Sequence, residues 1–171
     1  MQKILIGMLL SFFSISALAI DGYKNIKFGS TFNEIKKLKV CNFQQYYTYK
    51  NIRGVTSYSC NDFKFLGKKT TAAIAFIDGK LGKFIIVIEP TGDEVKSILE
   101  AMESKYGKPN FNNISANMKP NEKPRIEFAN GSIYLTEKEY QGNSEVYITY
   151  AKPEFDAEFN KRNKESINSD I

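Results

Sequence analysis

The fold is decided by the stretch Thr71-Ala-Ala-Ile-Ala-Phe-Ile77-Asp78-Gly79-Lys-Leu81-Gly-Lys-Phe-Ile-Ile-Val-Ile88. An Asp-Gly pair between two apolar runs is a strong signal for a two-residue β-hairpin turn. The runs 71–77 and 81–88 are the most apolar strand candidates in the chain. We therefore expect an antiparallel hairpin whose two strands lie at the centre of a sheet.

Further strand candidates lie on both sides of this hairpin. A second hairpin signal, Asn130-Gly131, separates runs 125–129 and 132–135. The remaining candidates are apolar or aromatic runs with high β-propensity, at 23–28, 43–49, 55–60, 63–66 and 145–150. The stretch 110–123 is rich in Asn, Ser, Lys and Pro, which predicts a loop.

Capping boxes predict the start of two helices. In a capping box, a Thr and the Glu three residues later cap the first turn of the helix. The first box, Thr31 with Glu34, predicts a short helix to about Leu38. The second, Thr91 with Glu94, predicts a longer helix that Gly107 ends. Its apolar side chains recur at helical spacing, at Val95, Ile98, Leu99 and Met102.

A third helix is expected to start at Pro153, because Phe155 and Phe159 lie one helical turn apart. The sequence becomes polar from Lys161, so residues 161–171 are predicted to form a frayed C-terminal tail.

A weak repeat relates the two capped helices. Residues 31–38 align with residues 91–98 at an offset of 60, and each copy precedes a hairpin signal. Two helix-then-sheet halves, 23–90 and 91–151, would explain this match. The alternative is that any two capped amphipathic helices look alike, and the sequence leaves both open.

The N-terminus, residues 1–19, has the pattern of a secretory signal peptide. Lys3 precedes an apolar run from Ile4 to Ile15, and Ala17-Leu-Ala19 is a small-x-small cleavage site. The alternative is a membrane anchor, but the run is shorter than the ~20 residues that span a bilayer. We expect cleavage after Ala19, no later membrane span, and a periplasmic or secreted protein.

Removal of that segment leaves 152 of the 171 residues, enough for one domain, which we place at 20–160. The net charge falls from +5 to +4 with the loss of Lys3. This small, dispersed positive excess lacks the dense basic stripe of nucleic-acid binders. No nucleic-acid partner is expected.

The two cysteines, Cys41 and Cys60, are expected to form a disulfide in an oxidising compartment. The bond would close a loop of about 20 residues and stabilise the fold by ~3 kcal/mol. Two free thiols are the alternative.

The chain contains no histidine. Nucleophilic systems that rely on an imidazole base are therefore excluded, as are imidazole-bearing zinc sites. No catalytic residue, cofactor or metal site is predicted. A hydrolase would have to use a pair of carboxylates, and the candidates are Asp78, Glu89, Asp93, Glu94, Glu127 and Glu145.

An aromatic tract between the cysteines is the strongest candidate for a binding surface. In a strand, Tyr46 and Lys50 would share one face. Tyr and Arg are enriched among the residues that dominate binding energy at interfaces. The candidate interface residues are Tyr46, Tyr47, Tyr49, Lys50, Arg53 and Tyr58. The alternative is a sheet rich in tyrosine whose rings only pack.

The pattern Ile26-Lys-Phe-Gly29-Ser-Thr31-x-x-Glu34-Ile35-x-x-Leu38, followed by strands, resembles small bacterial envelope modules. These are related to the outer-membrane assembly lipoprotein BamE and to the β-lactamase inhibitor proteins. The resemblance implies helices packed on an antiparallel sheet, and a role in binding or assembly. This chain lacks the lipidated cysteine and has a single cysteine pair.

Together, these features predict an α+β domain with an antiparallel sheet and helices packed on one face. The expected function is non-enzymatic binding of another envelope or extracytoplasmic protein, as an inhibitor, immunity factor or assembly factor. A carboxylate-based envelope hydrolase and a carrier of an apolar or lipid ligand are the alternatives.

Overall fold

The computed structural model describes residues 20–46, 52–114, 118 and 122–169. The predicted signal peptide, 1–19, lies outside these residues. The first half of the fold contains β1 (Gly22–Tyr23), β2 (Ile26–Lys27), α1 (Phe32–Lys37), β3 (Gln44–Tyr46), β4 (Val55–Phe65), β5 (Lys68–Ile77) and β6 (Lys80–Ile88). The second contains α2 (Gly92–Tyr106), β7 (Phe111–Asn112), β8 (Arg125–Phe128), the 3₁₀ turn η1 (Ala129–Gly131), β9 (Ile133–Tyr140), β10 (Asn143–Ala151) and α3 (Phe155–Ser169).

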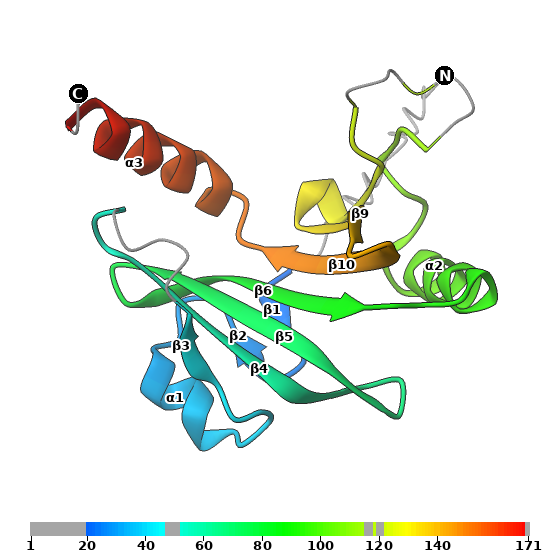
Figure 1. Ribbon diagram of the computed structural model, residues 1–171, viewed down its shortest axis with the longest axis horizontal. Helices are drawn as coiled ribbons and strands as arrows, with labels where there is room; N and C mark the ends of the chain where they lie inside the picture. Colours follow the sequence, from blue (N-terminus) through cyan, green and yellow to red (C-terminus); the bar gives the residue numbers. More distant parts are fainter. Residues whose placement is uncertain (1–19, 47–51, 115–117, 119–121, 170–171) are drawn as a thin grey trace, which may run out of the picture.

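One eight-stranded antiparallel sheet forms the body of the protein, in the order β3-β4-β5-β6-β10-β9-β8-β7 (Figure 1). The α+β class and the antiparallel sheet are confirmed. Each of the two helices that start with a capping box is followed by a four-stranded meander, and the meanders join where β6 pairs with β10. The predicted hairpin is also confirmed, because β5 and β6 pair around Asp78 and Gly79, which both have positive φ.

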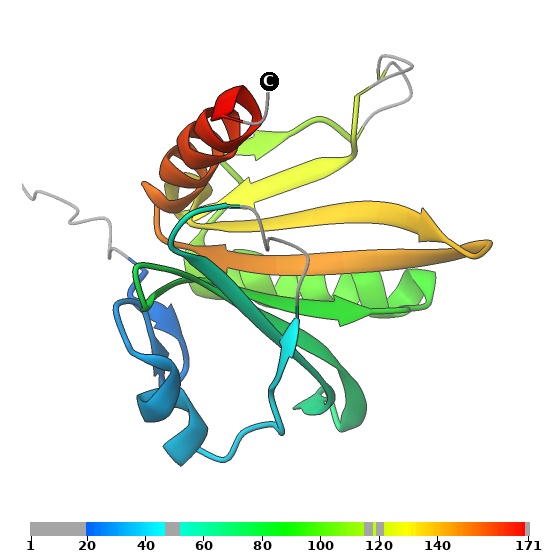
Figure 2. The same cartoon turned by 60° about the vertical axis from the view of Figure 1, so that its left-hand side comes forward.

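The hydrophobic core lies on one face of this sheet. Phe84 and Ile86 of β6 and Ile148 of β10 are fully buried there. Helix α1 contributes Ile35 to the same cluster, and α2 contributes Ile98 and Met102. The β1–β2 hairpin adds Tyr23, whose ring stacks on that of Phe84 with centroids 5.0 Å apart. Figure 2 shows α2 behind β6 and β10, on this core face.

Helix α3 lies on the opposite face, which corrects the expectation that all helices pack on one face. Its first residue, Phe155, covers Gly82 so closely that a Cβ at position 82 would overlap the ring. Lys83 forms an ion pair with Asp156, and Lys83 points away from its buried neighbour Phe84 because side chains alternate along a strand. Figure 1 accordingly shows α1 below and α3 above the strands β4 to β6.

The C-terminal segment is also more ordered than expected. Residues 161–169 continue α3 as a helix rather than forming a frayed tail. The physical reason is Arg162, which forms two hydrogen bonds to the carboxylate of Asp78 and one to the backbone carbonyl of Arg53. These contacts fix the helix against the β5–β6 turn.

Strand β9 is longer than the run 132–135 that the sequence indicates. It extends to Tyr140 and pairs with β10 through a turn at Gln141 and Gly142, both of which have positive φ. The second half of the strand extends beyond the core, and residues 137–139 are all charged. The sequence therefore shows no alternation of apolar and polar residues there from which a strand could be predicted.

Within the described ranges, no helix is long and apolar enough to cross a membrane.

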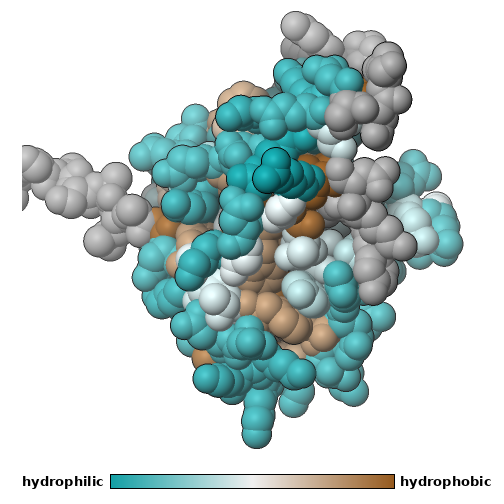
Figure 3. Space-filling view, turned by 90° about the vertical axis from the view of Figure 1, so that its left-hand side faces the viewer, coloured by the Kyte–Doolittle hydropathy of each residue, from teal (hydrophilic) through white to brown (hydrophobic). Residues whose placement is uncertain are grey.

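Figure 3 shows the end of the molecule that carries the last turns of α3 in Figure 1. Brown and pale side chains lie in the middle of this end, and hydrophilic side chains surround them.

Candidate functional site

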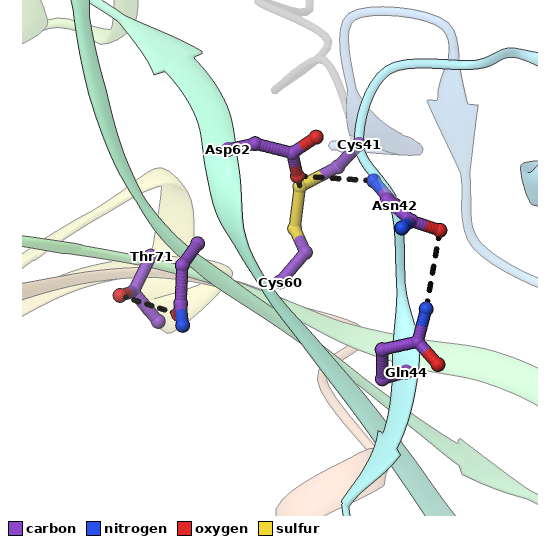
Figure 4. The surroundings of a disulfide bond; sticks show 7 residues. Cys41, Asn42, Gln44, Cys60, Asp62 and Thr71 are labelled. Carbon is purple, nitrogen blue, oxygen red and sulfur yellow. Dashed lines mark hydrogen bonds between the residues drawn. A yellow bond between two sulfur atoms is a disulfide. The ribbon is translucent and has the colours of Figure 1, made fainter.

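The expected disulfide is present and anchors the strand that carries Tyr46. Cys41 and Cys60 are bonded, with their Cα atoms 6.2 Å apart. Cys60 is buried in β4, whereas Cys41 lies just before β3. Asp62 accepts a hydrogen bond from the Asn42 N–H at 3.0 Å and lies 2.9 Å from the Cys41 sulfur (Figure 4). The edge strand β3 is therefore held at its N-terminal end by a covalent bond and a hydrogen bond.

The structure separates two of the candidate interface residues. Tyr46 pairs with Ser57, whereas Tyr58 pairs with Gln45, so the two tyrosines point to opposite faces of the sheet. Tyr46 is 56% exposed. Tyr58 is half-buried on the core face, where its ring stacks on Phe32 with centroids 3.7 Å apart.

Four candidate interface residues remain, and the structure describes one of them. Arg53 is exposed, and its backbone carbonyl accepts a hydrogen bond from Arg162. Tyr47, Tyr49 and Lys50 lie outside the described residues.

The face of the sheet opposite the core is the best candidate for a site. We call it the open face, because α1 and α2 cover the other side and α3 covers only one end of this one. Strand register assigns to it alternate residues from β3 to β10, which are Tyr46, Ser57, Ala73, Ala75, Lys83, Ile85, Val87, Arg125, Glu127, Tyr134, Thr136, Lys138, Glu145, Tyr147 and Thr149.

The apolar part of the open face is only half covered. Ala73, Ile85 and Val87 are half-buried there, although they lie in the central strands. Their neighbours on the core face, Phe84 and Ile86, are completely buried. Apolar side chains at the centre of a large sheet are thus left in partial contact with solvent, a feature typical of interaction surfaces.

A polar cluster occupies the end of the open face next to α3. Lys83 pairs with Asp156, whose other carboxylate oxygen accepts a hydrogen bond from the Tyr134 hydroxyl at 3.1 Å. Burial opposes the charge on Lys83, but Tyr134 and Asp156 more than offset it and raise the pKa of the ammonium group. The guanidinium of Arg125 lies 3.7 Å from the centre of the Tyr134 ring and pairs with Glu127. Ion pairs, a hydrogen bond from the neutral Tyr134 phenol and a ring contact thus hold Lys83, Asp156 and Arg125 in fixed positions.

A second cluster surrounds Tyr147 in β10. Its hydroxyl donates a hydrogen bond to Glu145 at 2.6 Å, and the Lys138 ammonium lies 4.7 Å from the centre of its ring. Burial, followed by Glu145, raises the pKa of Tyr147 to about 12. The phenol is therefore protonated at neutral pH and acts as a hydrogen-bond donor.

The sheet that carries the open face is curved rather than flat, as Figure 2 shows. Tyr46 lies on its edge strand β3, and Tyr147 lies on β10, four strands further along the sheet.

The sequence reasoning missed the residues that define the open face, above all Lys83, Arg125, Tyr134 and Tyr147. A signal was present for Lys83, which is the one charged residue inside the apolar run 81–88. Charged or tyrosine side chains also alternate with core residues in β8 and β10, so period-two analysis of each strand would have marked the same face.

Two cavities at the borders of the open face bear on the alternative functions. A groove of about 290 Å³ lies between α2 and the strands β8 to β10, with apolar side chains that include Val95, Leu99 and Ile114. A cavity of about 340 Å³ lies at the β4–β5 turn and the start of α2, and Glu89, Glu94 and Glu145 line it. Glu94 caps α2 and pairs with Lys68, and these bonds lower the pKa of its carboxyl group.

Fold and site together define a disulfide-bonded α+β protein whose curved sheet carries tyrosines on its open face. The chain belongs to a protein family whose model, described as "Uncharacterised protein", matches residues 23–170. The match therefore extends over both meanders and all of α3.

One curated relative is uncharacterized protein PM0314 of Pasteurella multocida (strain Pm70), which is 28% identical over 102 residues. The match covers 56% of this chain and 51% of the relative, so it spans about half of the relative's length. No solved structure gives a significant match to the chain.

Proposed function

We propose that this protein binds another extracytoplasmic protein through the open face, as an inhibitor, immunity factor or assembly factor, without catalysing a reaction. The observation that carries the proposal is the composition of that face. Tyr147 and Arg125 are held there by a hydrogen bond and by ring contacts, Arg125 over the buried ring of Tyr134, and half-buried apolar side chains lie beside them. Tyr and Arg in fixed positions around an apolar centre are typical of binding hot spots.

The width of this face supports a protein partner in particular. Tyr46 on the edge strand and Tyr147 in β10 lie four strands apart on the same face, so one partner segment laid across the strands can contact both. Lys138 and Glu145 add one charge of each sign, so the surface favours a partner with mixed charge over a polyanion. The disulfide reduces the freedom of β3 before binding, which lowers the entropy cost of association.

The extracytoplasmic location rests on two features. The Cys41–Cys60 bond fits an oxidising compartment, where disulfides form and persist. The pattern of residues 1–19 adds the expectation of a cleaved signal peptide. We place the protein in the periplasm or outside the cell.

The two capped helices, each with a following meander, support a duplicated helix-then-sheet unit. The same arrangement supports a relationship to BamE and the β-lactamase inhibitor proteins, and that relationship implies a role in binding or assembly. We propose both the duplication and this relationship.

A carrier of an apolar ligand is the second candidate, and the groove beside α2 favours it. Val95 and Leu99 are half-buried along this groove, and Ile114 is 54% exposed. Its volume of about 290 Å³ is at the lower end of the range for ligand pockets. The hydrolase alternative has weaker support, because the shifted pKa values of Glu94 and Asp78 are lowered, whereas a general acid needs a raised pKa.

The test is capture of partners from a periplasmic extract, followed by binding measurements with the purified partner. Tyr46→Glu and Tyr147→Ala should each raise Kd by about 30-fold, the effect of losing one hot-spot side chain. Leu38→Glu is the matched control, because Leu38 is 36% exposed at the C-cap of α1, on the other side of the sheet. Equal weakening by the control, or loss of binding only together with a lower melting temperature, would overturn the open face as the interface.

A further inference from the structure

An open cavity of about 760 Å³ lies on the other side of the molecule from the open face, beside the disulfide. Four lysines line it, and they come from separate elements. Lys24 lies in the β1–β2 turn, Lys36 in α1, Lys39 just after α1 and Lys64 in β4. The sequence spacing does not reveal this cluster, because folding alone brings the four residues together.

The positive charge of this cluster is largely uncompensated. None of the four lysines forms an ion pair with any residue that the structure describes, whereas Lys27, Lys68 and Lys83 all do. Among the residues that the structure describes, Asp62 is the one carboxylate that lines the cavity, and it already accepts the Asn42 N–H. Lys24 lies over the ring of Tyr23, 5.3 Å from its centre, a contact that leaves its charge in place. Like charges gathered around a concavity without carboxylate partners raise the local positive potential and concentrate anions there.

Fold stability accounts for the placement of only one of these four lysines, Lys36 in the last turn of α1. Lys39 follows the C-cap of α1 with φ 51°, and Lys24 has φ 52°. Glycine or asparagine is favoured over lysine in this left-handed conformation. The negative end of the helix dipole explains a cation at Lys36, but not at Lys24 or Lys64, which belong to other elements.

We propose that this cavity binds a phosphate-bearing ligand, either a free phosphorylated molecule or a phospholipid headgroup. Lysine ammonium groups on flexible stems bind phosphate as point charges. The amide side chains of Asn25 and Asn42 line the same cavity and can donate hydrogen bonds to phosphate oxygens. The disulfide fixes the wall formed by Cys41 and Asn42, so this part of the site exists before the ligand arrives. The site is separate from the open face and does not depend on a role for that face.

The test uses the oxidised, purified protein and two probes. Pyrophosphate binding is measured by calorimetry, and cosedimentation is measured with vesicles of phosphatidylglycerol and of phosphatidylcholine. The variant Lys24→Asn/Lys39→Asn removes two charges and keeps residues that tolerate the left-handed backbone. We expect it to weaken binding about 30-fold, since each lysine near an anionic surface contributes about fivefold, and to keep or raise the melting temperature.

The control is Lys161→Asn/Lys164→Asn on α3, which makes the same change in net charge at exposed positions. It should leave binding unchanged. Pyrophosphate binding that only the first variant weakens identifies a free phosphorylated ligand. Binding to phosphatidylglycerol vesicles alone, with the same loss, identifies a headgroup. Failure to bind either probe, or equal weakening by both double variants, overturns the proposal.

Discussion

Arg162 of α3 holds Asp78 of the β5–β6 turn through two hydrogen bonds, with N–O distances of 2.8 and 2.7 Å. The two residues are 84 positions apart, and the bond ties the last helix to the hairpin at the centre of the sheet. The guanidinium side chain is largely covered, whereas the carboxylate is largely exposed. Arg162 also donates to Glu158 and to the carbonyl of Arg53, so one side chain fixes three segments.

Removal of this bond should release α3 without unfolding the sheet. Arg162→Ala is expected to increase hydrogen exchange of the amides in 155–169, while the amides of β5 and β6 stay protected. Lys161→Ala is the control, because Lys161 is the exposed neighbour on the same helix. Unchanged exchange in the Arg162 variant would contradict the assignment of Arg162 as the residue that orders the C-terminus.

Acid should have the same effect on the wild-type protein. The hydrogen bond from Arg162 lowers the pKa of Asp78. A carboxyl group whose pKa is lower in the folded state stabilises above its unfolded pKa, about 3.9, and this contribution is lost as the pH falls through the folded value. We therefore expect α3 exchange to rise below about pH 4, and Asp78→Asn to abolish that rise. If hydrogen exchange of α3 has the same pH profile in Asp78→Asn as in the wild type, the Arg162–Asp78 pair does not hold the helix.

Gly82 should be one of the least replaceable residues of the sheet. Gly82→Ala would place a methyl group where the Phe155 ring lies, and the expected loss of stability is about 1–3 kcal/mol. Gly92→Ala is the matched control, since a Cβ there meets nothing within 4 Å and the position starts α2. Urea denaturation of both variants provides the comparison. A neutral Gly82 variant would mean that Phe155 does not pack there.

The disulfide should stabilise the protein chiefly by restricting the unfolded chain. Cys41→Ser/Cys60→Ser is expected to lower the free energy of unfolding by ~3 kcal/mol, and reduction of the wild type should give the same loss. Both are measured by urea denaturation. Agreement between them is the internal control, and a stability unchanged by both would contradict a structural role of the bond.

Local patterns predicted the elements that depend on local chemistry. The capping boxes at Thr31 and Thr91 and the turn at Asp78 appear where the sequence places them. The position of α3 was not predictable, because it depends on Phe155 reaching Gly82 and Arg162 reaching Asp78 across the fold. Of the candidate interface residues that the structure describes, Tyr46 lies on the open face and Tyr58 does not, because the register of β3 with β4 sets the face of each, and a single strand read alone does not reveal that register.

The titration of Tyr147 should report directly on the open face. Burial comes first and the bond to Glu145 second among the causes that raise its pKa to about 12. Glu145→Gln should therefore lower the pKa part of the way toward the usual value near 10, and the remainder reflects burial. NMR of ring-labelled tyrosine measures the pKa, and Tyr147→Phe assigns the resonance.

Because the pKa of Tyr147 is higher in the folded state than in the unfolded state, its contribution to stability is complete below pH 10 and is lost between about pH 10 and 12. A Glu145→Gln variant with the wild-type pKa would show that the carboxylate does not hold the phenol. A partner bound to the open face should raise the pKa of Tyr147 further, since it buries the ring.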